Sequence, residues 1–116
     1  GYQSAVKDLK ESTKQRFVAL DFDYPSPQVE SEIIAHEAGI SEDVARLVVE
    51  IGARSRNLRG HGLDEGASTR MLIQAGRLIG RGIPVREACR IALVVPVTDD
   101  VDMRAALSRA IEACIA

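Results

Sequence analysis

An arginine at the head of a predicted helix is the side chain in this sequence best placed to bind an anion. Arg70 stands in the first turn of a helical run that extends to Gly82. Backbone N–H groups and the helix dipole favour negative charge at that end, so an arginine there is unfavourable unless an anion or a carboxylate lies nearby. Arg70 therefore either points at a phosphate or belongs to a solvated arginine face, and the spacing alone leaves both interpretations open.

The same run predicts which side of this helix faces the core. Arginine and glutamine side chains recur at steps of four, three and four residues, so they share one face. Apolar side chains recur at helical spacing on another face, which predicts a buried stripe. The polar face comprises Arg70, Gln74, Arg77 and Arg81, and the apolar face comprises Met71, Leu72, Ala75, Leu78 and Ile79.

The composition predicts one helical domain with a modest aliphatic core. The 116 residues are 46% hydrophobic and 28% charged, but only 3% are aromatic. A net charge of −2 argues against a general nucleic-acid binder. No apolar run approaches the roughly 20 residues of a membrane span. No signal-peptide pattern opens the sequence, so we expect a cytoplasmic protein without a membrane span.

One segment reads as a β-strand. Apolar and polar side chains alternate from residue 16 to residue 24, and Pro25 then stops the pattern. A lone strand leaves its backbone N–H and C=O groups without partners, so it is not stable by itself. We therefore expect this strand to belong to the sheet of an α/β core that precedes the sequence, which would make the chain a fragment.

The remainder predicts a mainly α fold of about four to five helices. Hydroxyl side chains stand where helices should begin, and glycine or proline stands where they should end. Ser26, Ser41 and Thr98 are the expected caps, while Gly39, the Gly82-Ile-Pro84 break and Pro96 are the expected ends.

Most other charged side chains fit solvated helix faces. The glutamates of the first helix do not have a spacing from which a catalytic carboxylate pair can be argued. The arginines near the end of the second helix add local positive charge, which is also the usual composition of a solvated face. These residues are Glu30, Glu32, Glu37, Arg54, Arg56 and Arg59.

The cysteines and histidines do not form a metal-ligand pattern. Cys89 and Cys114 each lie among apolar residues at helical spacing, which indicates two buried structural thiols. A disulfide between them is the alternative, and it would imply an oxidising compartment. His36 and His61 are isolated, so we expect surface or helix-end residues and no metal site.

The segment Leu63-Asp-Glu-Gly-Ala-Ser-Thr-Arg70 resembles the second-sensor motif of the MoxR branch of AAA+ ATPases, and more narrowly its CbbQ/NirQ/NorQ group. The resemblance covers residues 1 to about 112 and includes Lys7-Asp-Leu-Lys, Ser12-Thr-Lys-Gln-Arg-Phe17, Asp21-Phe-Asp-Tyr-Pro25 and Thr98-Asp-Asp100. In that group the motif opens a helix of the C-terminal lid domain, and its arginine reaches the nucleotide phosphates. The resemblance thus implies that Arg70 binds an ATP phosphate at a site that includes Gly66 and Ser68.

The resemblance also assigns a role to Arg16, at the start of the predicted strand. In related ATPases an arginine at this place projects into the nucleotide site of the neighbouring subunit as an arginine finger. An exposed basic residue at a strand start is the alternative. On the same basis, residues 1–25 would be the end of the AAA+ α/β core and residues 26–116 the helical lid domain.

For the full-length protein, the resemblance implies a ring-forming ATP hydrolase, a hexamer, that uses ATP and Mg²⁺. Relatives act as chaperone-like activators of a metalloenzyme, of the Rubisco or the nitric oxide reductase type, with a von Willebrand factor A domain partner. This sequence contains no Gly-x-x-x-x-Gly-Lys-Ser/Thr loop and no acidic Walker B strand. We therefore expect the chain alone to be inactive and to bind no nucleotide.

A different class of function remains open on the sequence. Helices joined by short glycine-containing turns also occur in free-standing protein- or DNA-interaction modules, the helix-turn-helix among them. The acidic balance and the unpaired strand argue against such a module.

Overall fold

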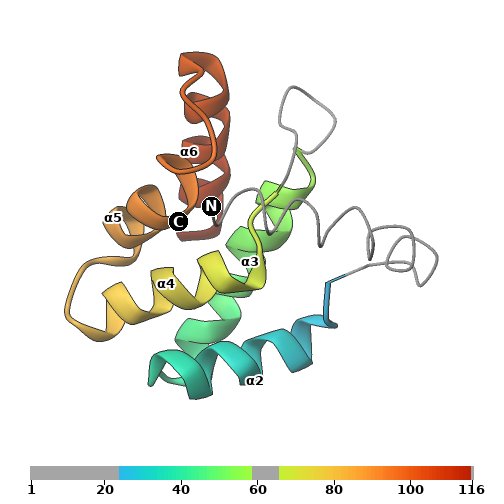
Figure 1. The fold of residues 1–116 in the computed structure, drawn as a ribbon, viewed down its shortest axis with the longest axis vertical. Coiled ribbons are helices and arrows are strands. Elements are labelled where there is room, and N and C mark those ends of the chain that lie inside the picture. The colour runs from blue at the N-terminus through green and yellow to red at the C-terminus, as the bar shows by residue number, and fades with distance from the viewer. Residues whose placement is uncertain (1–23, 59–65, 116) are drawn as a thin grey trace, which may run out of the picture.

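The computed structural model describes residues 24–58 and 66–115, which form a bundle of helices (Figure 1). The predicted mainly α class is confirmed. The predicted strand over residues 16–24 lies outside the described residues except for its last position, so the strand and the division at residue 25 stay predictions. The elements are α2 (Pro27–Ala38), α3 (Glu42–Arg56), α4 (Thr69–Gly80), α5 (Val85–Cys89), the π-helix η1 (Arg90–Val94) and α6 (Val101–Ile115).

Three helices begin where a serine hydroxyl can accept a backbone N–H group. Each of these serines accepts a hydrogen bond from the amide three residues later, which satisfies one of the unpaired donors of the first turn. The bonds run from Val29 to Ser26 at 3.3 Å, from Val44 to Ser41 at 3.2 Å, and from Met71 to Ser68 at 3.2 Å.

The last helix begins differently from the expectation. Thr98 was the expected cap, but Asp100 Oδ1 accepts the N–H of Met103 at 2.8 Å. The Thr98 hydroxyl instead accepts the N–H of Asp100 at 3.0 Å. The carboxylate therefore caps α6, where its negative charge also suits the helix dipole, and the threonine orders the turn before it.

Between the expected break at Gly82-Ile-Pro84 and the expected end at Pro96, the helical segment changes its hydrogen-bond pattern halfway. After α5, η1 widens to a π-turn, in which the N–H of Val95 donates to the carbonyl of Arg90 at 3.0 Å. Ala92, Leu93 and Val94 are all buried, although they are consecutive. These three residues are buried because η1 packs against both α4 and α6. The wider π-turn occurs at this buried apolar run.

Helix α3 is central to the bundle, since it contacts α2, α4 and α6 (Figure 1). The first and last helices of the described chain lie at opposite ends of the bundle in that view. Glycine permits the close approach of α3 and α4, because a Cβ atom on Gly52 would lie 2.7 Å from Leu72 Cδ1. The core is aliphatic, as the composition predicts, and includes Ile34, Val48, Ile51, Leu72, Leu93, Leu107 and Ile111.

Candidate functional site

The predicted anion-binding arginine lies on the surface at the N-terminal end of α4. Arg70, like Gln74, Arg77 and Arg81, is exposed. The prediction from spacing that these four side chains share one polar face of the helix is confirmed. On the other side of the helix, Leu72 and Ala75 are fully buried. Within the part of the chain that the structure describes, no side chain forms an ion pair or hydrogen bond with Arg70. None of the described side chains therefore competes with an anion for the guanidinium donors of Arg70.

Gly66 and Ser68 set the start of this helix. Ser68 is its N-cap, and its hydroxyl is used to accept the N–H of Met71. Gly66 is buried, and a Cβ atom there would lie 2.6 Å from the Cα atom of Arg56. Only glycine allows the segment before α4 to pass this close to the end of α3. Arg16, the predicted arginine finger, lies outside the described residues.

A buried ion pair joins α2 to α3, at positions where the sequence predicts solvated faces. The side chain of Glu30 is 1% exposed and that of Arg56 is 9% exposed. Arg56 Nη1 donates to Glu30 Oε1 at 2.9 Å, and Nη2 donates to Oε2 at 2.7 Å. The prediction of a solvated face is thus wrong for both residues. The two partners are far apart in the sequence, so neither helix's own pattern shows the pair.

The same ion pair is attached to the first turn of α4. Arg56 Nε donates to the carbonyl oxygen of Ala67 at 2.8 Å, and the hydroxyl of Thr69 donates to Glu30 Oε2 at 2.7 Å. The N–H of Ala67 donates to the buried hydroxyl of Ser55 at 3.1 Å. The residues just before Arg70 are therefore bonded to both α2 and α3.

The buried charges are fully compensated. Burial is the largest single influence on the pKa of Glu30 and raises it. The hydrogen bonds from Arg56 and Thr69, with the charge of Arg56, outweigh burial, so the pKa is lowered overall. The Arg56 guanidinium also lies over the ring of Tyr24, 3.5 Å from its centroid. Among the described residues, every buried side-chain nitrogen or oxygen has a hydrogen-bond partner.

The lowered pKa of Glu30 gives the stability a pH dependence. Its folded pKa lies below the ordinary value of 4.5, so the pair stabilises the fold above that pH and loses this contribution as pH falls through the folded pKa. We expect acid to reduce the unfolding free energy less steeply in Glu30→Gln than in the wild type, as measured by urea unfolding at several pH values. Glu37→Gln, at an exposed position of the same helix, is the control. Equal acid dependence of Glu30→Gln and wild type would contradict this account.

The two cysteines are free thiols with different exposure. Cys89 is buried, as predicted, and its burial, with a smaller effect of the neighbouring Cys114, raises its pKa to about 12. Cys114 is only half-buried, so the prediction of a buried thiol is not met there. The pKa of about 12 keeps the Cys89 thiol protonated and unreactive at neutral pH.

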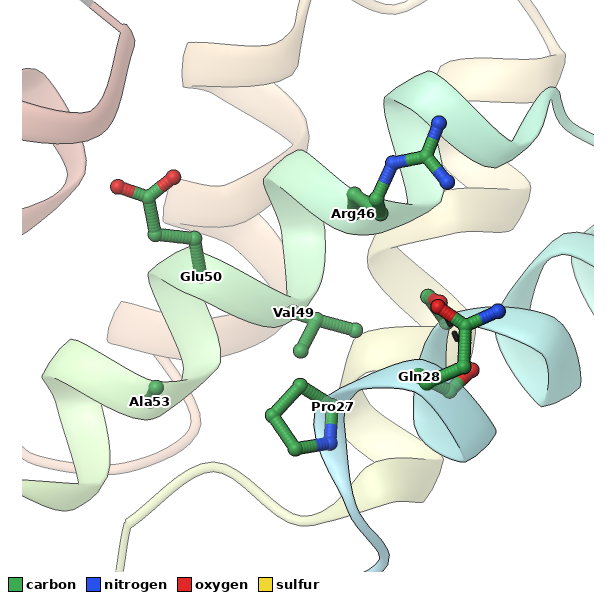
Figure 2. A pocket seen from close by; sticks show the side chains of 7 residues that line it. Pro27, Gln28, Arg46, Val49, Glu50 and Ala53 are labelled. Carbon is green, nitrogen blue, oxygen red and sulfur yellow. Dashed lines mark hydrogen bonds between the residues drawn. The ribbon is translucent and has the colours of Figure 1, made fainter.

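A groove lies between α2 and α3, apart from Arg70 and the start of α4. Its volume is about 350 Å³. Figure 2 shows the side chains of Pro27 and Val49 facing one another across it, with those of Arg46 and Glu50 toward its rim. Neither Arg70 nor the residues that start its helix line the groove. Its lining comprises Pro27, Gln28, Ser31, Arg46, Val49, Glu50 and Ala53.

Residues 24–58 and 66–115 contain no helix that is both long and apolar enough to cross a bilayer. In the same ranges, no group of three or more His, Cys, Asp or Glu side chains is placed to hold a metal ion.

Known proteins resemble this chain over nearly its whole length. Protein CbbQ of Hydrogenophilus thermoluteolus is 60% identical over 116 residues, which are 100% of this chain and 43% of that protein. The denitrification regulatory protein NirQ of Pseudomonas aeruginosa is 53% identical over 92% of this chain and 41% of its own length. Protein NorQ of Paracoccus denitrificans is 42% identical over 92% of this chain and 40% of its own length.

The chain thus spans about two fifths of the length of these curated relatives. Residues 30–114 match the family described as CbbQ/NirQ/NorQ C-terminal. This match includes the ion pair, the start of α4 and Arg70. The chain belongs to the CbbQ/NirQ/NorQ C-terminal family.

Proposed function

We propose that this chain is the lid portion of a MoxR-type AAA+ ATPase, and that Arg70 contacts the γ-phosphate of ATP. The observation that carries the proposal is the position of Arg70: exposed, in the first turn of α4, with no partner among the described residues. An arginine there opposes the helix dipole, and a bound phosphate offsets that cost. Family membership supports the same assignment.

The chemistry proposed for Arg70 is electrostatic. Negative charge spreads over the oxygens of the γ-phosphoryl group as it is transferred to water. A guanidinium held at that place stabilises this charge without having to reorganise during the step. Arg70 would act on the nucleotide of its own subunit, and Arg16 would act on the nucleotide of the neighbouring subunit in a hexameric ring. ATP and Mg²⁺ would be held chiefly by the α/β core.

Gly66 and Ser68 serve the same site through the backbone. Ser68 caps α4, and the missing side chain of Gly66 lets the preceding segment lie against Arg56. Their contribution to nucleotide binding in this proposal is to place Arg70, because the Ser68 hydroxyl already accepts a backbone N–H group.

We further propose that the complete protein is a cytoplasmic, chaperone-like activator of a metalloenzyme. Two client types are proposed, Rubisco or nitric oxide reductase, and membership of the CbbQ/NirQ/NorQ C-terminal family supports an activator of this group without separating the two. A von Willebrand factor A domain protein would be its partner. Coupling ATP hydrolysis to a client requires the lid to move with the nucleotide state, and Arg70 is the contact through which it would do so.

The proposal is tested by the ATP turnover of the complete protein when Arg70 is replaced by alanine. A strong loss of turnover with an intact fold supports it, and wild-type turnover would contradict the assignment of Arg70.

A further inference from the structure

Stability alone is a weak reason for a buried ion pair such as Glu30–Arg56. A buried ion pair loses the hydration of two charges, and well-packed apolar side chains in its place often leave a protein equally stable or more stable. Here both side chains are nearly inaccessible to solvent, at 1% and 9% exposed. What charged groups supply, and apolar ones do not, is hydrogen bonds of fixed direction to other parts of the chain.

Those directed bonds converge on the residues just before Arg70. Arg56 uses both terminal nitrogens on Glu30 and its Nε on the carbonyl of Ala67, at 2.8 Å. Glu30 Oε2 accepts from Arg56 at 2.7 Å and from the hydroxyl of Thr69 at 2.7 Å. Thr69 is the first residue of α4 and is bonded covalently to Arg70. One network therefore joins α2, α3 and the start of α4.

We propose that Glu30, Arg56 and Thr69 are positioning residues that determine where Arg70 stands relative to α2 and α3. This inference rests on the proposed function, in which Arg70 contacts a phosphate of ATP. Arg70 itself has no partner among the described residues, so its place is set by its backbone, and its backbone is held by Thr69 and Ala67. Misplacing a catalytic group by about 1 Å can cost on the order of 100-fold in rate.

The same geometry makes the three helices one unit. If α2 and α3 rotate as a body, the bonds to Thr69 and Ala67 would carry the first turn of α4 with them. Under the proposed function, such a rotation would change the distance between Arg70 and the phosphate, and binding of the phosphate by Arg70 would favour one position of α2 and α3 through the same bonds.

Thr69 offers the sharpest test, because its hydroxyl can be removed without leaving the ion pair unpaired. In the complete protein, Thr69→Val should lower ATP turnover by about 10-fold, the scale of a sub-ångström misplacement. Thr69→Ser keeps the hydroxyl and should retain most of the wild-type turnover. The two variants thus separate the hydrogen bond from the bulk of the side chain.

A double-mutant cycle separates positioning from general damage. If Thr69 acts through Arg70, Thr69→Val should have no further effect on turnover in an Arg70→Ala background. Ile111→Val, at a buried position of α6, is the control for lost stability and should leave turnover at the wild-type level when assayed well below its unfolding temperature. Unfolding midpoints measured for every variant show that each is folded in the assay.

The outcomes distinguish this inference from the proposed function. Wild-type turnover in Arg70→Ala would overturn the proposed function, and this inference with it. Impaired turnover in Arg70→Ala with normal turnover in Thr69→Val would overturn the inference alone. So would effects of Thr69→Val and Arg70→Ala that multiply in the double variant, because Thr69 would then act independently of Arg70.

Discussion

Replacing Arg70 with alanine in the complete protein should lower ATP turnover by about 100-fold or more, the usual cost of removing one donor that stabilises transition-state charge. The fold should be unaffected, because the Arg70 side chain is exposed and contributes nothing to the core. The measurement is steady-state phosphate release at saturating ATP, with circular dichroism and an unfolding curve for each variant.

Arg77→Ala is the matched control for this result. Arg77 is exposed on the same face of α4, two turns further along the helix and away from its N-terminal end. Turnover close to the wild-type rate in Arg77→Ala, together with a large loss in Arg70→Ala, would show that the position at the helix start matters rather than the positive charge. Equal losses in both variants would favour a general effect of the arginine face.

Replacing Arg56 with leucine should lower the free energy of unfolding by about 3–5 kcal/mol, the cost of removing one partner of a buried ion pair. The carboxylate of Glu30 would stay buried without its guanidinium, and the carbonyl of Ala67 would lose a donor. Urea or thermal unfolding measures the loss.

Two further variants test the physical reason for this loss. Arg54→Leu, two residues away on α3, changes an arginine whose side chain is 48% exposed and should have little effect. The double variant Glu30→Leu with Arg56→Leu removes both charges and should recover much of the stability lost in Arg56→Leu. An Arg56→Leu protein as stable as Arg54→Leu would show that the pair is not buried as described.

The local features of the fold could be predicted because they depend on neighbouring residues. Ser26 and Ser41 precede apolar helical patterns, and the structure confirms both as caps. The arginine face and the apolar stripe of α4 follow from a period of about 3.6 residues, which requires no knowledge of the rest of the chain.

The buried ion pair could not be predicted in the same way. Glu30 and Arg56 are each ordinary on their own helices, and their burial depends on how α2 and α3 pack. One signal was present: Glu30 stands four residues before the buried Ile34, and hence on the same face of α2. Without knowing the partner, a charged residue on a core face suggests an error in the pattern as readily as a buried pair.

The start of α6 and the π-turn of η1 are two further features that residue spacing alone does not predict. Thr98 and Asp100 are both good caps, and only the packing of the preceding turn decides which side chain accepts the helix N–H group. The π-turn of η1 has no signature in residue spacing, since its consecutive buried residues resemble a short buried helix.

The contact between Arg70 and nucleotide is tested most directly by an experimental structure of the complete protein with a non-hydrolysable ATP analogue and Mg²⁺. We expect guanidinium nitrogens of Arg70 to lie within hydrogen-bond distance, about 2.7–3.2 Å, of γ-phosphate oxygens in the same subunit. Arg70 directed into solvent, while the nucleotide site is occupied and closed, would show that Arg70 does not contact the nucleotide.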